Sequence, residues 1–214
     1  MKPIDERNCL KDKKSIMNAW MKEIKDNSIV FDFKKARKEK LFTAMSELQV
    51  KGIEAILHEC QKHAVTLKTQ IAYILATAYH EGYDYDGKST GKVQRIVPIK
   101  EKGSEAYLQS KSYYPFIGRG YVQITWLENY KKYQKIIRKE FGVDIIMNPD
   151  ELLRVDIAAF VIVHGLKYGM FTGKKLSDYI TSYKTDFPNA RRVVNWTDKA
   201  ELISRYAMSF LKCF

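Results

Sequence analysis

The sequence lacks several features that would assign it directly to a class. It has only 3 cysteines, far apart in a chain of 214 residues, which indicates free thiols rather than a disulfide framework. No apolar run approaches the ~20 residues that a membrane-spanning helix needs. The first residues, MKPIDERNCLKDKK, carry charges where a secretory signal has its apolar segment. We therefore expect no transmembrane segment and synthesis in the cytoplasm, of a host or of a bacterium, without a visible signal peptide.

Signatures of metal and nucleophilic chemistry are also missing. His80-Glu81 begins like the zinc motif HExxH, but no second histidine follows at the required spacing. His58, Cys60 and His63 match no common zinc spacing, and three unrelated helix residues explain them better. There is no GxSxG motif of a serine hydrolase. We expect neither a metal nor another cofactor.

What the sequence has in excess is positive charge. Its 37 lysines and arginines outnumber 25 acidic residues, which gives a net charge of +12. Such a surface favours polyanions: nucleic acid, anionic lipid, or a wall polymer rich in carboxylate and phosphate. The basic residues are spread over many segments, so the charge alone does not choose among these partners.

The order of patterns predicts one mainly helical domain. Residues 31–214 are long enough for a sizeable core, and residues 1–30 form an N-terminal extension, with an amphipathic helix through 16–24, that we expect to pack on it. A small β element is expected near residues 90–126. Asn148-Pro149 marks a helix start, followed by an apolar, buried helix through 157–163. Further helices are expected at residues 45–63, 66–82, 128–141, from about 175, and 198–210.

The segment TLKTQIAYILATAYHEG places a carboxylate on an apolar face. Its apolar residues recur at helical spacing, and Glu81 continues the same face just before Gly82, a natural helix stop. Burial and the negative end of the helix dipole both disfavour the charged form of Glu81, as a general acid requires. The alternative is a glutamate at a frayed helix end that reaches into solvent.

The segment GRGYVQITWLENY, residues 118–130, alternates apolar and polar residues and predicts a half-buried strand. Its apolar side chains would face the core; these are Val122, Ile124 and Trp126. Its polar side chains carry no charge, unlike those of an ordinary solvated face; these are Tyr121, Gln123 and Thr125. The glycines would permit a tight backbone at the strand entry. Glu101 lies upstream between Lys100 and Lys102, which favour its ionised form. Two carboxylates with neutral hydrogen-bonding groups between them are typical of glycoside hydrolysis.

A series of segments in this order resembles a known family. They are AYILATAYHEG, PIKEKG, YYPFIGRGYVQITWLENYKKY, MNPDELL, GMFTGKKLSDYI and NARRVVNWTDKAELISRYA. Together they are similar to the family 19 chitinase-like glycoside hydrolases, in the branch of phage endolysins and bacterial wall hydrolases, over residues 45–214. The resemblance implies a lysozyme-like, mainly α (α+β) fold with a cleft between two lobes. It also implies inverting hydrolysis of β-1,4 links to N-acetylated amino sugars, with the two carboxyl groups ~6.5–9.5 Å apart.

The resemblance implies roles for individual residues. Glu81 matches the general acid, although the family usually has threonine where this chain has Gly82. Glu101 matches the base that activates water, with Asp84 or Asp86 as alternatives. Water and substrate would be held by the following residues: Tyr121, Gln123, Thr125, Asn129 and Asn195. Arg119 is expected to brace the fold by pairing with a nearby acid, and Arg191 to contact substrate or brace Glu81.

The expected function is therefore lysis of bacterial cells by a monomeric endolysin that cleaves peptidoglycan glycan strands. It would act at the wall or in the periplasm after the membrane is permeabilised. Chitin is the alternative substrate. A rival interpretation is a non-catalytic basic protein that binds glycan or nucleic acid, supported by the charge and 14 tyrosines. No nucleic-acid-binding motif is present in the sequence, and we expect no nucleic-acid partner.

Overall fold

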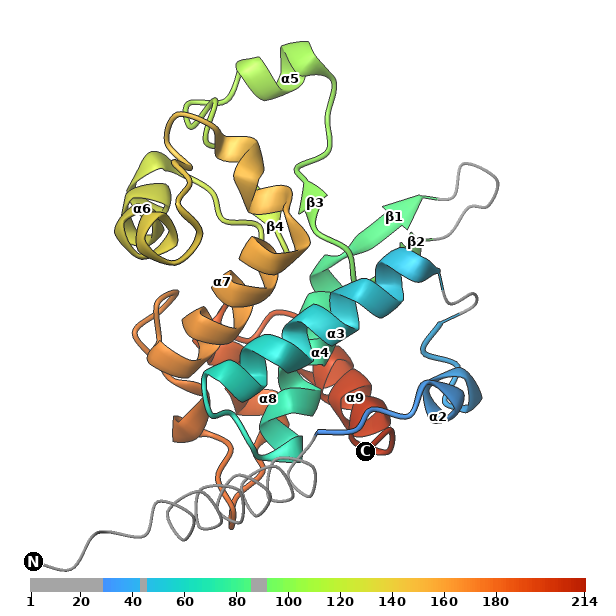
Figure 1. Ribbon diagram of the computed structural model, residues 1–214. Helices are drawn as coiled ribbons and strands as arrows, with labels where there is room; N and C mark the ends of the chain where they lie inside the picture. Colours follow the sequence, from blue (N-terminus) through green and yellow to red (C-terminus); the bar gives the residue numbers. More distant parts are fainter. Residues whose placement is uncertain (1–28, 43–45, 86–91) are drawn as a thin grey trace, which may run out of the picture. The chain divides into compact units, whose positions relative to one another are not determined.

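The computed structural model describes residues 29–42, 46–85 and 92–214, with the side chains of 83–94 left out of the description. The chain divides into a short segment, Met1–Val30, and a body, Phe31–Phe214 (Figure 1). The helix expected through residues 16–24, and its packing, lie outside the described residues. Asp86 lies outside them as well.

The body is mainly helical, as the sequence predicts. Its α-helices are α2 (Phe33–Lys38), α3 (Glu47–Lys62), α4 (Lys68–Glu81), α5 (Glu105–Gln109), α6 (Leu127–Phe141), α7 (Val155–Tyr168), α8 (Phe187–Ala190) and α9 (Ala200–Leu211). Short 3-10 helices are η1 (Pro149–Leu153), η2 (Leu176–Asp178) and η3 (Arg191–Val193). The described strands are β1 (Tyr83–Tyr85), β2 (Lys92–Gln94), β3 (Ile99–Lys100) and β4 (Arg119–Gly120). They form two antiparallel pairs, β1 with β2 and β3 with β4.

Helix α4 lies at the centre of the body. The residues from Ile71 to Tyr79 are all buried, so the apolar face expected from the sequence is only part of a helix covered on every side. It packs most extensively on α9 and also contacts α3 and α7 (Figure 1). Helix α7, predicted as a buried apolar helix, is buried from Ile157 to Leu166. Helices α4 and α7 therefore form the buried centre on which α3, α9 and η1 pack.

Helix α6 has one apolar face and one charged face. Tyr130, Tyr133 and Ile137 point inward and are at most 1% exposed, in a cluster that includes Phe160 of α7. The helix ends at Gly142, whose φ of 71° is in the left-handed region that glycine adopts without steric cost. The helix predicted over residues 128–141 is thus confirmed.

The strand predicted after Gly118 is not present. Only Arg119–Gly120 is extended, and the chain then turns back, with mutual backbone hydrogen bonds between Arg119 and Ile124 of 3.2 and 3.0 Å. Gln123 has a φ of 51° and Trp126 a φ of 73°. Side chains alternate between faces only along extended backbone, so the expected assignment of faces fails.

Two residues show the error plainly. Tyr121, expected to face a ligand, is 0% exposed, whereas Trp126, expected in the core, is 51% exposed. Tyr121 instead packs beside α3: a Cβ added at Gly52 would lie 2.7 Å from its hydroxyl oxygen. Tyr121 is therefore a core residue and not part of an exposed ligand-binding face.

Other helix predictions are only partly confirmed. Pro149 begins the short 3-10 helix η1, and the buried helix α7 begins separately at Val155, so Asn148-Pro149 does not open it. The short helices α2, α5 and α8 were not predicted. The helix expected from about residue 175 is the three-residue η2, and the last helix begins at Ala200 rather than near Asp198. The small β element begins at Tyr83, earlier than expected. Within the described part of the chain, none of the helices combines the length and apolar character needed to span a membrane.

Candidate functional site

Glu81 is the last residue of α4, and its side chain is 23% exposed. Its Oε1 lies 3.0 Å from Nη1 of Arg191, a side chain only 3% exposed. This nitrogen makes no hydrogen bond to the described residues, so the contact is an ion pair without hydrogen-bond geometry. The sequence predicted surroundings that disfavour the charge on Glu81. The adjacent guanidinium has the opposite effect.

Arg191 is held in place by its own segment. Its Nε donates to the carbonyl oxygen of Asp198 at 3.0 Å, and its carbonyl oxygen accepts from the amide of Asn195 at 2.9 Å. The turn of η3 points Arg191 inward and leaves Asn195 exposed. This geometry is the one expected of a residue that braces Glu81.

His80 precedes Glu81 and is affected by the same charges. Burial lowers the pKa of His80 below its ordinary value, although the nearby Glu81 acts in the other direction. Its Nδ1 is buried and has no hydrogen-bond partner among the described residues. His80 is therefore neutral at pH 7 and adds no positive charge beside the acid.

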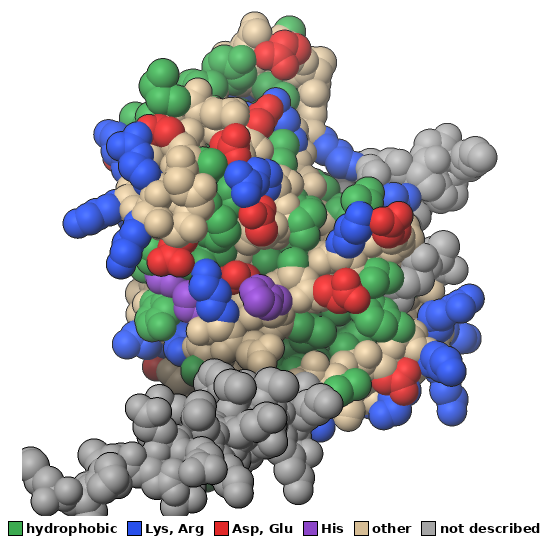
Figure 2. Space-filling view, in the orientation of Figure 1, with side chains coloured by type: hydrophobic (Ala, Val, Ile, Leu, Met, Phe, Trp, Pro, Cys, Tyr) green, Lys and Arg blue, Asp and Glu red, His purple; other side chains and the backbone are tan. Residues whose placement is uncertain are grey.

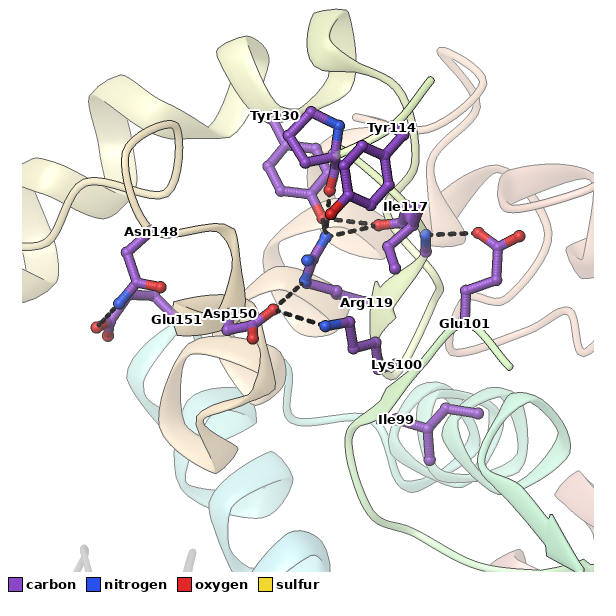
Figure 3. Close-up of polar contacts among 12 residues, drawn as sticks. Ile99, Lys100, Glu101, Tyr114, Ile117, Arg119, Tyr130, Asn148, Asp150 and Glu151 are labelled. Carbon is purple, nitrogen blue, oxygen red and sulfur yellow. Dashed lines mark hydrogen bonds and ion pairs between the residues drawn. The ribbon is translucent and has the colours of Figure 1, made fainter. Parts of the chain in front are cut away.

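Glu101 follows β3 and is held by two donors. The hydroxyl of Tyr113 donates to Oε1 at 2.8 Å. The amide of Gly118 donates to Oε2 at 2.9 Å, the bond drawn from Glu101 in Figure 3. Lys100 does not approach this carboxylate: its ammonium lies 3.7 Å from Asp150. Consecutive residues of an extended segment point to opposite sides, which separates Lys100 from Glu101. A tyrosine and a backbone amide thus hold the carboxylate of Glu101, while Lys100 pairs with Asp150.

Gly118 brings Glu101 together with the polar residues of the following turn. A Cβ at Gly118 would lie 2.7 Å from Oε1 of Gln123 and 3.3 Å from Oγ1 of Thr125. The missing side chain therefore lets both groups reach the peptide whose amide binds Glu101. Nε2 of Gln123 donates to the carbonyl of Ile99 at 2.9 Å, which fixes the orientation of its amide.

A pocket of about 190 Å³ adjoins this turn. Three of the predicted site residues, Gln123, Thr125 and Asn129, line it. The Nδ2 of Asn129 donates to the carbonyl of Thr125 at 2.8 Å. The apolar lining consists of Val122, Ile124, Tyr133, Met170, Phe171 and Val194. Since Val194 follows η3, the pocket joins the turn to the segment that carries Arg191.

Arg119 is a brace, as its pairing with a nearby acid shows (Figure 3). Its side chain is 5% exposed, and its Nε donates to Asp150 at 2.6 Å. Nη1 donates to the hydroxyl of Tyr130 at 2.8 Å and to two backbone carbonyls, of Pro115 and Ile117. Partial burial alone would raise the pKa of Asp150, but the hydrogen bond and charge of Arg119 outweigh it and hold the pKa below its ordinary value.

Some predicted residues stay apart from this group, and others were missed. Asp84 lies in β1, but its side chain is outside the description, as is the whole of Asp86. Tyr113 and Asp150 were not identified from the sequence, because nothing in their spacing shows that they meet Glu101 and Arg119. Tyr113 also packs on Trp126, with ring centroids 5.0 Å apart.

The chemistry of the site is that of carboxylates and neutral hydrogen-bonding groups. Among the described residues, no cluster of three or more His, Cys, Asp or Glu side chains is placed to hold a metal ion. No protein-family model matches the chain, and none of the curated proteins matches it.

Proposed function

We propose that the protein is an endolysin-type glycoside hydrolase that cleaves β-1,4 links of peptidoglycan glycan strands by inverting acid–base catalysis. One observation carries the proposal. The amide of Gly118 donates to the carboxylate of Glu101, and Gln123 and Thr125, which line a pocket, lie beside the Cα of the same glycine. A fixed carboxylate beside neutral polar groups suits the activation and orientation of a water molecule.

Glu101 takes the role of the general base. A carboxylate offers about four lone-pair positions, and Tyr113 and Gly118 occupy one on each oxygen. The remaining positions are available to a water, whose proton Glu101 removes as the water attacks the sugar. Thr125 donates its hydroxyl to the carbonyl of Gln123, so its oxygen is oriented to accept from that water.

Glu81 takes the role of the general acid that protonates the leaving oxygen. It is partly exposed at the end of a rigid helix, and Arg191 limits its movement. The cation also favours the ionised form, so the proposal requires bound substrate to exclude water and favour the protonated form. An inverting reaction further requires ~6.5–9.5 Å between the two carboxyl groups, which leaves space for the water.

The choice of peptidoglycan rests on the net charge of +12, since wall strands carry carboxylates and chitin is neutral. On this proposal the protein acts as a monomer at the wall, after the membrane is permeabilised. Chitin oligomers are the alternative substrate. A non-catalytic basic protein that binds glycan is the remaining alternative, and the absence of hydrolysis products would favour it.

The test compares Glu81→Gln with the wild type on purified peptidoglycan and on chitin oligomers. We expect new reducing ends at N-acetylmuramic acid from the wild type, and at least a ~10²-fold lower rate from the variant. Glu47→Gln makes the same chemical change at a side chain 80% exposed on α3, and should act like the wild type.

Three outcomes would contradict the proposal. Undiminished lysis of permeabilised Gram-negative cells by a folded Glu81→Gln variant would remove Glu81 from the mechanism. Products from chitin alone would reverse the choice of substrate. Retention of the β configuration in the first product would exclude inversion.

A further inference from the structure

The outer face of α6 carries a row of cations that the catalytic proposal does not use. Five basic side chains are exposed along this 15-residue helix: Lys131, Lys132, Lys135, Arg138 and Lys139. Figure 2 shows basic side chains projecting over the part of the view that α6 occupies in Figure 1. Only two acidic residues, Glu128 and Glu140, belong to the same helix.

Local contacts account for some of these cations. Lys131 pairs with Glu128 at 3.6 Å, and Arg138 pairs with Asp144. In contrast, no hydrogen bond or ion pair joins Lys135 or Lys139 to any residue in the described parts of the chain. Lys139 in the last turn gains from the helix dipole, but Lys135 in mid-helix does not. Contacts within the described fold therefore do not explain the positive charge at Lys135.

The row begins at the candidate site. Nζ of Lys132 donates to Oδ1 of Asn129 at 3.1 Å, and Asn129 lines the pocket with Thr125. Lys135 and Lys139 follow Lys132 at the spacing of one helix side. At 1.5 Å per residue, the row extends roughly 15 Å from Asn129 to Lys139. A linear polymer that entered the pocket and continued along α6 would meet several ammonium groups.

The apolar side of α6 restricts the kind of ligand. Tyr130, Tyr133 and Ile137 are packed in the core, so this helix has no apolar face to insert into a lipid surface. Exposed lysines attract hydrated anionic groups through a screened, long-range interaction. The ligand that fits is therefore a hydrophilic chain with carboxylates at intervals.

We propose that the outer face of α6 binds the carboxylates of the peptide stems on a peptidoglycan strand whose glycan occupies the pocket. This inference rests on the proposed function and specifies its substrate class. The lysines distinguish anionic wall strands from neutral chitin. The lysines raise the affinity for the strand and the rate of association, whereas Glu81 and Glu101 catalyse cleavage of the glycosidic bond.

The test measures binding in the full chain carrying Glu81→Gln, so that no substrate is consumed. Pelleting with purified sacculi compares the parent with the double change Lys135→Glu and Lys139→Glu. We expect the dissociation constant to rise about tenfold, from the cost of two lost cations near an anionic surface. Lys135→Arg with Lys139→Arg keeps the charge and should keep the affinity.

The matched control is Lys34→Glu with Lys38→Glu, on the exposed side of α2, an element that carries none of the site residues. This pair changes the net charge equally and should alter binding by less than about twofold. An amidase that removes the stems releases soluble glycan strands and frees a lactyl carboxylate on each N-acetylmuramic acid. Once these carboxylates are amidated, the strands should compete with sacculi equally for the parent and for the α6 variant. Melting temperatures of all variants check that each is folded.

An equal loss from the α2 control, or a loss that persists on stem-free strands, would overturn the inference. So would α6-dependent binding to phosphatidylglycerol vesicles or duplex DNA as strong as that to sacculi. Failure of the proposed function has a different signature. In that case the protein that keeps Glu81 would release no reducing ends from the sacculi, while its binding would still depend on α6 and on the stems.

Discussion

The two buried arginines of the body, Arg119 and Arg191, make opposite use of their charge. Arg119 donates to Asp150, to a tyrosine hydroxyl and to two carbonyls, so its guanidinium has hydrogen-bond partners within the fold. Arg191 donates through Nε to one carbonyl and holds Nη1 next to Glu81 without a hydrogen bond. Arg119 connects segments of backbone, whereas Arg191 places charge beside a partly exposed acid. The difference separates a structural arginine from one that serves a site.

The largest effect on stability is expected from Arg119→Leu. Loss of its hydrogen bonds leaves buried carbonyls and the Tyr130 hydroxyl with fewer partners, at a cost of about 3 kcal/mol in the free energy of unfolding. Urea denaturation measures this cost. Lys100→Met is the matched control because Lys100 pairs with the same Asp150 at 3.7 Å but is 42% exposed. It should cost less than about 0.5 kcal/mol. Equal costs would show that Arg119 does not brace the fold.

Arg191→Met should act mainly on catalysis. Without the guanidinium, Glu81 is less well positioned, and we expect kcat to fall about 10²-fold. Arg191→Lys keeps a cation near the 3.0 Å contact with Glu81 and should recover part of the lost kcat. An unchanged kcat in a folded Arg191→Met variant would assign Arg191 to the fold alone.

The smallest effect is expected at His164, a buried histidine of α7. Burial, together with the nearby His63, lowers the pKa of His164 in α7 to about 4. A folded pKa below the unfolded value of ~6.5 means that the neutral form stabilises the fold above pH 6.5. This contribution is lost as the pH falls from 6.5 toward 4.

His164→Phe removes this dependence. Between pH 7 and pH 5, the wild type should lose about 1 kcal/mol more unfolding free energy than the variant does. Thermal unfolding at both pH values measures the difference. An identical pH dependence in the two proteins would show that His164 does not titrate as its burial indicates.

Helical periodicity predicted much of the fold. The spacing of Ile53 and Ile56 predicted their burial in α3, although Leu48, expected on the same side, is 60% exposed. Gly82 ends α4 where expected. The failure came between Gly118 and Trp126. Alternation over so few residues is compatible with a strand or with a tight turn. The turn has positive φ angles at Gln123 and Trp126, and the residue types at these positions do not predict them.

The candidate site was only partly predictable. Resemblance indicated Glu81, Glu101, Gln123, Thr125 and Asn129. It did not indicate that Tyr121 is buried, or that Tyr113 and Gly118 hold the carboxylate of Glu101. Those facts depend on contacts between segments, which sequence spacing does not specify.

By itself, the sequence predicted most of the longer helices and the chemical types available, because local periodicity and side-chain chemistry are properties of short segments. The tertiary structure alone decided which charges meet. Arg191 reaches Glu81 across more than a hundred residues, and Lys100 turns from Glu101 to Asp150. Such pairings depend on the three-dimensional packing of α4, η3 and the β3–β4 turn, because the energy of an ion pair depends on the distance between its charges in space and not on their separation along the chain.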